Sequence, residues 1–125
     1  MRGQKLFVRA IEAGDAANIR EFFESNATPD AAPACGLIGK LLGRLVAVMA
    51  ISLSEPGSIR IDGLLVDREL RRKRIGRVMV NELETFARKM ERDWLIAEAA
   101  GTSREFLRRV GFVEEGQRMM KKVAR

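Results

Sequence analysis

The chain has 125 residues and a formal net charge of +6, with 46% hydrophobic and 32% charged residues. This length and composition predict one globular domain over residues 1–125. No apolar run reaches 18 residues and no signal peptide or internal repeat is recognisable, so we expect a cytoplasmic protein without membrane association.

The chain contains no histidine, no tyrosine and a single cysteine, Cys35. These absences exclude Ser-His-Asp and Cys-His catalysis as well as zinc sites built from imidazoles or thiolates, so no metal is expected. Catalysis would have to use carboxylates, lysines, hydroxyls, backbone amides and water, which favours a reaction whose activated group arrives on a cofactor. Cys35 lies among small apolar residues, which predicts a packed position.

The first half of the chain predicts a strand, a helix and then hairpins. Residues 6–10 form an apolar strand pattern, and Asp15 is a suitable N-cap for a helix over 16–25. Two prolines in 26–33 predict a loop. Three further strands are expected at 34–40, 44–53 and 59–66.

The second half predicts helices that alternate with strands. Apolar residues at helical spacing indicate a helix over 74–91, followed by a buried strand at 94–99. A short helix at 102–110 and two short strands within 112–124, turning near Gly116, complete the chain. This order predicts an α/β domain with a mixed sheet.

A basic turn precedes the long helix. Segment 66–77 carries six basic residues against two acidic ones. Because the first N–H groups of a helix have no intrahelical partners and the helix dipole attracts anions, the turn predicts a site for a phosphorylated ligand such as a cofactor diphosphate. A solvated charged loop is the alternative interpretation. The basic residues are Arg68, Arg71, Arg72, Lys73, Arg74 and Arg77.

Three motifs occur in a characteristic order. VRAIEAGDAANIREFF at 8–23 combines a strand with a helix, Arg71, Arg74 and Gly76 fall on the pattern [Q/R]-x-x-G-x-[G/A], and REFLRRVGF at 104–112 is similar to F-Y-x-x-x-G-F. Together they resemble the GNAT superfamily of acetyl-CoA-dependent N-acyltransferases. The resemblance implies a three-layer α/β (α+β) domain, with a mixed, mostly antiparallel sheet flanked by helices.

The resemblance also implies acetyl-CoA as co-substrate. In the family, backbone amides of the turn hold the pyrophosphate, and the preceding strand pairs with the pantetheine arm where two strands splay apart, here 59–66 and 94–99. The cofactor-binding residues implied in this way are Leu64, Leu65, Val66, Arg71, Arg72, Lys73, Arg74, Ile75, Gly76 and Arg77.

Three departures from the family pattern matter. Arg74 replaces the first turn glycine. If this position needs a positive φ, the arginine costs about 1 kcal/mol and lowers coenzyme affinity. We expect instead ordinary helix-start geometry, with the arginine adding charge beside the phosphates. Leu107 stands where the family commonly places a tyrosine as general acid, and Ala100 to Thr102 stand where an asparagine is often found; water, Thr102 or Ser103 could replace the acid. The loop after the first helix is too short for the family's usual second helix, which predicts an open acceptor site.

Glu98 and Asp62 are the candidate general bases. Glu98 ends its strand at a position that resembles a catalytic glutamate of some family members, and Asp62 lies on the facing strand. A carboxylate placed there could take a proton from an ammonium group. For either residue, a solvated charge or a structural ion pair is the alternative interpretation.

The leading hypothesis is an N-acetyltransferase that moves an acetyl group from acetyl-CoA to a primary amine by direct transfer in a ternary complex. The acceptor is expected to be a small-molecule amine or an amine of a peptide or protein. The alternative is a catalytically degenerate GNAT fold that binds coenzyme A or a protein partner without turnover. The basic balance also suggests nucleic acid, but an aromatic content of 6% argues against it. The oligomeric state stays open, with a homodimer as one alternative.

Overall fold

The computed structural model describes residues 6–71, 74–98 and 103–124, and its centre is a seven-stranded sheet in the order β1-β2-β3-β4-β5-β7-β6. Neighbouring strands are antiparallel except for the parallel pair β4 and β5. The strands are β1 (Phe7–Ala10), β2 (Gly36–Leu41), β3 (Arg44–Ser52), β4 (Ser58–Val66), β5 (Trp94–Glu98), β6 (Val113–Glu115) and β7 (Arg118–Lys122). The mixed, mostly antiparallel sheet is thus confirmed.

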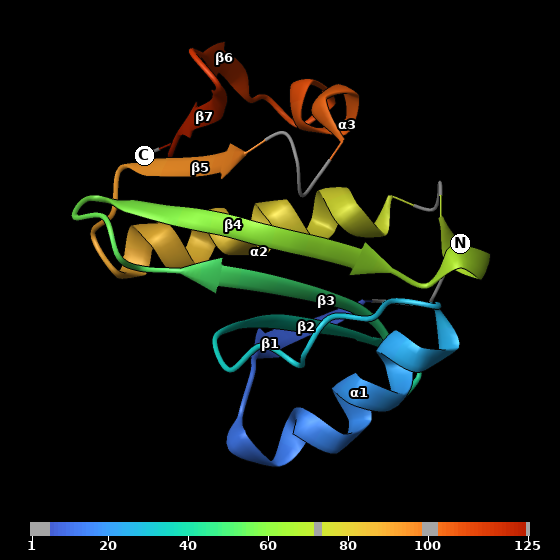
Figure 1. The fold of residues 1–125 in the computed structure, drawn as a ribbon. Helices are drawn as coiled ribbons and strands as arrows, with labels where there is room; N and C mark the ends of the chain where they lie inside the picture. The colour runs from blue at the N-terminus through green and yellow to red at the C-terminus, as the bar shows by residue number, and fades with distance from the viewer. Residues whose placement is uncertain (1–5, 72–73, 99–102, 125) are drawn as a thin grey trace.

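Helices cover both faces of this sheet (Figure 1). The α-helices are α1 (Ala16–Ser25), α2 (Ile75–Lys89) and α3 (Arg104–Arg109), and two 3₁₀ turns, η1 (Ala13–Asp15) and η2 (Arg68–Leu70), precede α1 and α2. Of the described helices, none is long and apolar enough to cross a membrane.

The two faces have separate apolar cores. Ile19, Phe22 and Phe23 of α1 pack with Ile38 and Val48 on one face. On the other face, α2 buries residues at intervals of four, which is the spacing that places side chains on one side of a helix. These residues are Ile75, Met79, Leu83 and Ala87, and they join Leu107 of α3 in the larger cluster.

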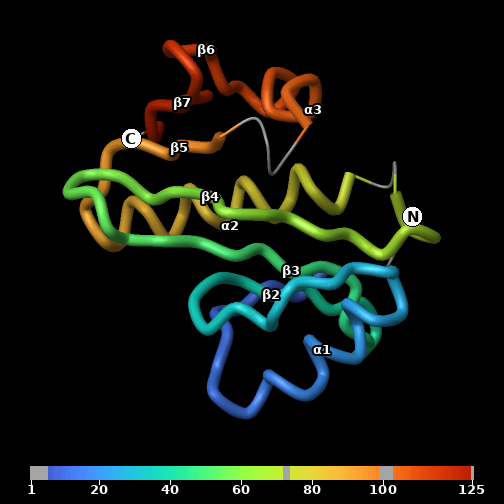
Figure 2. The backbone as a smooth tube through the Cα atoms, viewed as in Figure 1, coloured from blue at the N-terminus to red at the C-terminus, as the bar shows by residue number. Residues whose placement is uncertain are grey.

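A β-bulge in β4 separates this strand from β5. Ile61 pairs with Ile51 and Gly63 pairs with Ala50, so Asp62 is the extra residue. The ladder with β5 ends at Ile61 and Ala97, whereas β4 continues past the end of β5 (Figure 2). Because a bulge bends and twists its strand, it fits the predicted splay, and the edge of β4 beyond Ile61 has no partner in β5.

One local prediction is confirmed in part and another was wrong. Asp15 is the N-cap of α1, which spans the predicted residues, but its side chain makes no capping hydrogen bond. Its carboxylate instead accepts hydrogen bonds from Arg9 at 2.8 Å and from the Glu12 N–H at 2.7 Å, and these donors hold the pKa of Asp15 well below its usual range. Cys35 is exposed rather than packed. It ends the segment between α1 and β2, which contains no helix, as its length predicted.

Candidate functional site

An open groove of about 860 Å³ lies where β4, the start of α2 and α3 meet. Its described lining residues are Leu64, Val66, Leu70, Arg71, Arg74, Ile75, Gly76, Arg77, Ser103, Phe106, Arg109 and Val110. We call it the arginine groove. It contains most of the cofactor-binding residues predicted from the sequence, namely Leu64, Val66, Arg71, Arg74, Ile75, Gly76 and Arg77.

Three of the predicted cofactor-binding residues are not among these lining residues. Arg72 and Lys73 lie outside the described residues. Leu65 packs with the α1 cluster on the opposite face of the sheet, because side chains alternate along a strand. The side chain of Leu65 therefore does not line the groove.

The groove is strongly cationic. Four arginines line it, and no acidic residue occurs among its described lining residues. The first N–H groups of α2 also lie here, where the helix dipole favours anions. Positive charge on both walls of a groove concentrates anionic ligands, so this arrangement can bind a polyanion.

Arg74 does not have the ordinary helix-start geometry that we expected. Its backbone is left-handed, with φ of +63° and ψ of 17°, and α2 begins at the next residue. The turn must reverse direction between η2 and α2, and the family pattern supplies a glycine for this purpose. A non-glycine residue in this region costs about 1–2 kcal/mol, so the guanidinium of Arg74 stands on a strained backbone.

Gly76 is required for space rather than for an unusual backbone angle. A Cβ atom at this position would lie 3.0 Å from two ring atoms of Phe106 and 3.6 Å from Leu64. The first turn of α2 therefore packs directly against the ring of α3. This contact fixes the distance between the two helices that form the walls of the groove.

The free edge of β4 forms the third wall. The N–H of Asp67 donates to Val46 of β3 at 2.8 Å, and backbone groups of alternate residues point to opposite edges of a strand. Leu64 and Val66 therefore direct their backbone groups toward the groove edge, where Arg71 Nε approaches the carbonyl of Val66 at 3.4 Å. An extended amide-containing ligand could pair with this edge.

Three groove residues were missed in the sequence, namely Phe106, Arg109 and Val110, whereas Ser103 was considered there only as a substitute acid. All four belong to α3 or its caps, and their spacing of three or four residues places them on one face of the helix. This spacing was visible in the sequence. However, the resemblance drew attention to Leu107, which is fully buried in the core on another side of the helix.

Leu107 stands where the family commonly has a tyrosine, and a buried leucine cannot act as an acid. Ser103 is the described hydroxyl nearest to that role, since it lines the groove. Its Oγ accepts a hydrogen bond from the N–H of Phe106 at 3.3 Å, which leaves its own proton available for donation. Ala100 to Thr102 lie outside the described residues.

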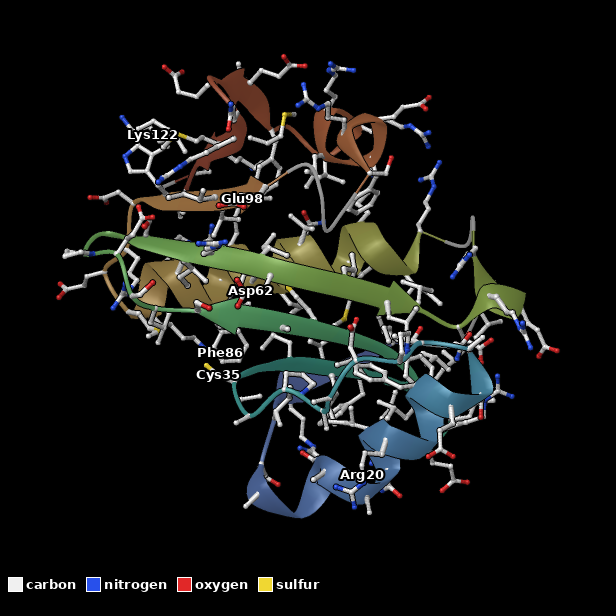
Figure 3. The ribbon with its side chains drawn as sticks, in the orientation of Figure 1. Arg20, Cys35, Asp62, Phe86, Glu98 and Lys122 are labelled. Atoms are coloured by element: carbon white, nitrogen blue, oxygen red, sulfur yellow. The ribbon has the colours of Figure 1, made fainter. Side chains whose placement is uncertain are left out.

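The two candidate bases meet on the face of the sheet turned away from α2 (Figure 3). Arg60 of β4 joins them, with Nε 3.3 Å from Asp62 and Nη2 3.0 Å from Glu98. Ser52 Oγ donates a hydrogen bond to Asp62. We call these four residues the Arg60 cluster. The structure thus brings Asp62 and Glu98 together at the point where β4 and β5 part, and gives Asp62 one more described partner than Glu98.

The described residues contain no group of three or more acidic, cysteine or histidine side chains that could hold a metal ion.

Comparisons with known proteins agree with this geometry. A family model described as "Acetyltransferase (GNAT) family" matches residues 5–112. A search of curated protein sequences found no match.

Solved structures of similar fold include Ard1 from Thermoplasma volcanium, with 14% identity, a TM-score of 0.78 and coverage of 96% of this chain and 99% of that one. The ribosomal-protein-S18-alanine N-acetyltransferase from Escherichia coli has 12% identity, a TM-score of 0.77 and coverage of 97% and 96%. A GNAT family N-acetyltransferase (YhbS) from Escherichia coli, solved in complex with CoA, has 13% identity, a TM-score of 0.76 and coverage of 99% and 84%. The chain belongs to the acetyltransferase (GNAT) family.

Proposed function

We propose that this protein is an N-acetyltransferase that moves an acetyl group from acetyl-CoA to a primary amine by direct transfer in a ternary complex. The observation that carries the proposal is the arginine groove, which opens directly onto the free edge of β4. A charged wall for phosphates and a strand edge for an extended amide arm are together what coenzyme A requires.

The residues present fit this coenzyme. The start of α2 and the guanidiniums of Arg71 and Arg74 would hold the diphosphate, and the close contact of Gly76 with Phe106 keeps that wall free of side-chain bulk. The backbone groups of Leu64 and Val66 would hold the pantetheine arm. Acetyl-CoA, when bound, supplies an activated acyl group as a thioester and a thiol leaving group.

The remaining chemistry belongs to the chain's own residues. A backbone N–H at the groove edge of β4 can stabilise negative charge on the acyl oxygen, because such donors are fixed before the reaction begins. Ser103 can donate its hydroxyl proton toward the departing sulfur. A carboxylate of the Arg60 cluster can accept a proton from the acceptor ammonium.

Glu98 is our first choice as this proton acceptor, and Asp62 is the second. Asp62 has two described partners, Ser52 and Arg60, whereas Glu98 has Arg60. A substrate ammonium can therefore replace the partner of Glu98 with less disruption. Glu98 also ends its strand beside the splay, so a proton taken there can pass to solvent.

The acceptor site is open, since no described helix stands between α1 and β2. We therefore propose either a small-molecule amine or an exposed amine of a peptide or protein as acceptor. The similarity to an enzyme described as acetylating the alanine of a ribosomal protein supports including peptide N-termini among the candidates.

The test is release of free thiol from acetyl-CoA across a panel of amines, polyamines and peptides with free N-termini. Amine-dependent thiol release that saturates with both substrates is expected. Saturable coenzyme binding without thiol release from any member would contradict catalysis, and would leave a coenzyme-binding protein. Absence of coenzyme binding would contradict the whole proposal.

A further inference from the structure

The arginine groove holds more positive charge than a diphosphate needs. Arg71 and Arg74 lie on the turn before α2, whereas Arg77 lies within α2 and Arg109 at the end of α3. No described lining residue is acidic. Two guanidiniums thus remain on the α3 side of the groove after the turn residues are assigned to a diphosphate.

These two residues lie together. Arg77 Nη2 approaches the backbone carbonyl of Arg109 at 3.4 Å, which joins the first turn of α2 to the last turn of α3. Phe106 packs against Gly76 one turn earlier in α3, so both helices are held at a fixed separation. The pair therefore stands on packed elements, and it borders the apolar side chains of Phe106 and Val110.

The guanidinium of Arg109 is available to a ligand. Its described partner is Glu105, at 3.3 Å and one turn away on the same helix, and the two side chains are 66% and 77% exposed. Exposed pairs of this kind contribute little, because both partners stay hydrated. A phosphate dianion can form charge-assisted, bidentate hydrogen bonds with arginine and would replace Glu105.

The connectivity of coenzyme A says which phosphate this would be. The pantetheine arm leaves one end of the diphosphate, and the ribose with its 3′-phosphate leaves the other. If the arm follows the edge of β4, the ribose must lie on the far side of the α2 N-terminus. Resting on the proposed function, we infer that Arg109, assisted by Arg77, binds the 3′-phosphate and makes the protein select coenzyme A over dephospho-coenzyme A.

The test compares two ligands that differ by this one phosphate. Calorimetric titrations of the full chain with coenzyme A and with dephospho-coenzyme A give both dissociation constants without any acceptor or turnover. For the unaltered protein we expect coenzyme A to bind about tenfold more tightly, which is typical of one charge-assisted contact. Arg109→Gln should bring coenzyme A to the affinity of dephospho-coenzyme A and should change the latter less than about twofold.

Arg108→Gln is the matched control. Arg108 is the neighbouring arginine of α3, but its side chain pairs with Glu114 and it is absent from the described groove lining. The tenfold preference should survive this change, and the Arg109→Lys variant, which keeps the charge, should retain part of it. Thermal melting checks that every variant is folded.

Three results would overturn the inference. Equal binding of both ligands by the unaltered protein would show that the 3′-phosphate is not read, although the proposed function would stand. An equal loss of affinity for both ligands in Arg109→Gln would show that Arg109 contacts a part of the molecule that both ligands share. Failure of both ligands to bind the unaltered protein would overturn the proposed function together with this inference.

Discussion

The arginine groove and the Arg60 cluster border the same splay but treat charge in opposite ways. The groove presents four arginines without a described acidic residue in its lining. In the Arg60 cluster, the arginine contacts two carboxylates, and nearby Arg118 binds both oxygens of Glu55 at 3.1 Å. One region is suited to a highly charged anionic ligand, while in the other region each charged side chain already has a partner of opposite charge.

This difference separates binding from chemistry. The excess positive charge of the groove attracts an anion, and only the exposed Glu105 side chain has to be replaced, so we expect the groove to determine coenzyme affinity. In a compensated cluster, a substrate must replace an existing partner. We therefore expect the Arg60 cluster to determine the rate and the choice of acceptor, with little influence on the coenzyme.

The largest effect is expected at Glu98. Glu98→Gln removes the proposed proton acceptor and should lower kcat by about 100-fold or more, because general bases contribute 10²–10⁴-fold. The dissociation constant of coenzyme A should not change. Steady-state kinetics and calorimetry measure the two quantities. A larger rate loss in Asp62→Asn than in Glu98→Gln would reverse our assignment of the base.

The next effect is expected in the groove. Gly76→Val forces a branched side chain against Phe106 and should displace the ring or the start of α2, which both line the groove. We expect coenzyme A binding to weaken by about tenfold or more. Gly14→Val is the control, because nothing lies within 4 Å of a Cβ at that position. Unchanged binding in the Gly76 variant would show that the ligand lies elsewhere.

Variants at Arg74 test whether this arginine adds charge to the groove at a cost in folding stability. The free energy of unfolding, measured by denaturant titration, should be about 1 kcal/mol larger for Arg74→Gly than for Arg74→Ala. Glycine relieves the left-handed backbone at this position, whereas alanine does not. Both variants lose the guanidinium, so any shared weakening of coenzyme binding reports the charge. Equal stability of the two variants would mean that the turn is not strained.

The smallest expected effect is on the pH dependence of folding stability. It concerns Asp15, which lies in neither the arginine groove nor the Arg60 cluster. Arg9 and the Glu12 N–H bind its ionised form, which lowers its pKa in the folded state. This stabilisation is complete above the ordinary value of about 4 and is lost as the pH falls below it. Asp15→Asn should therefore be less stable at pH 7, by about 1 kcal/mol, and should lose less stability on acidification.

Denaturant titrations at pH 7 and at acidic pH measure this difference. Parallel loss of stability in both proteins on acidification would mean that the ion pair of Asp15 contributes nothing.

The order of strands and helices could be predicted because it follows from local patterns. The apolar spacing of α2 and the turn residues after β3 indicate these elements without any knowledge of their neighbours. The short segment between α1 and β2 likewise predicted that no second helix stands there. These features depend on residues close together in the chain.

Other features depend on contacts between distant residues and could not be predicted. The left-handed backbone of Arg74 was indicated only by the glycine that the family pattern has at this position, since arginine itself does not favour such an angle. The packing of Phe106 against Gly76, and the ion pairs that Arg60 forms with both candidate bases, require the sheet and α3 to be in place.

The central claim is that the arginine groove binds the coenzyme, and titration calorimetry with acetyl-CoA tests it most directly. We predict saturable binding of one acetyl-CoA per chain, weakened by Gly76→Val and unaffected by Glu98→Gln. No heat of binding and no thermal stabilisation at millimolar acetyl-CoA would contradict the account.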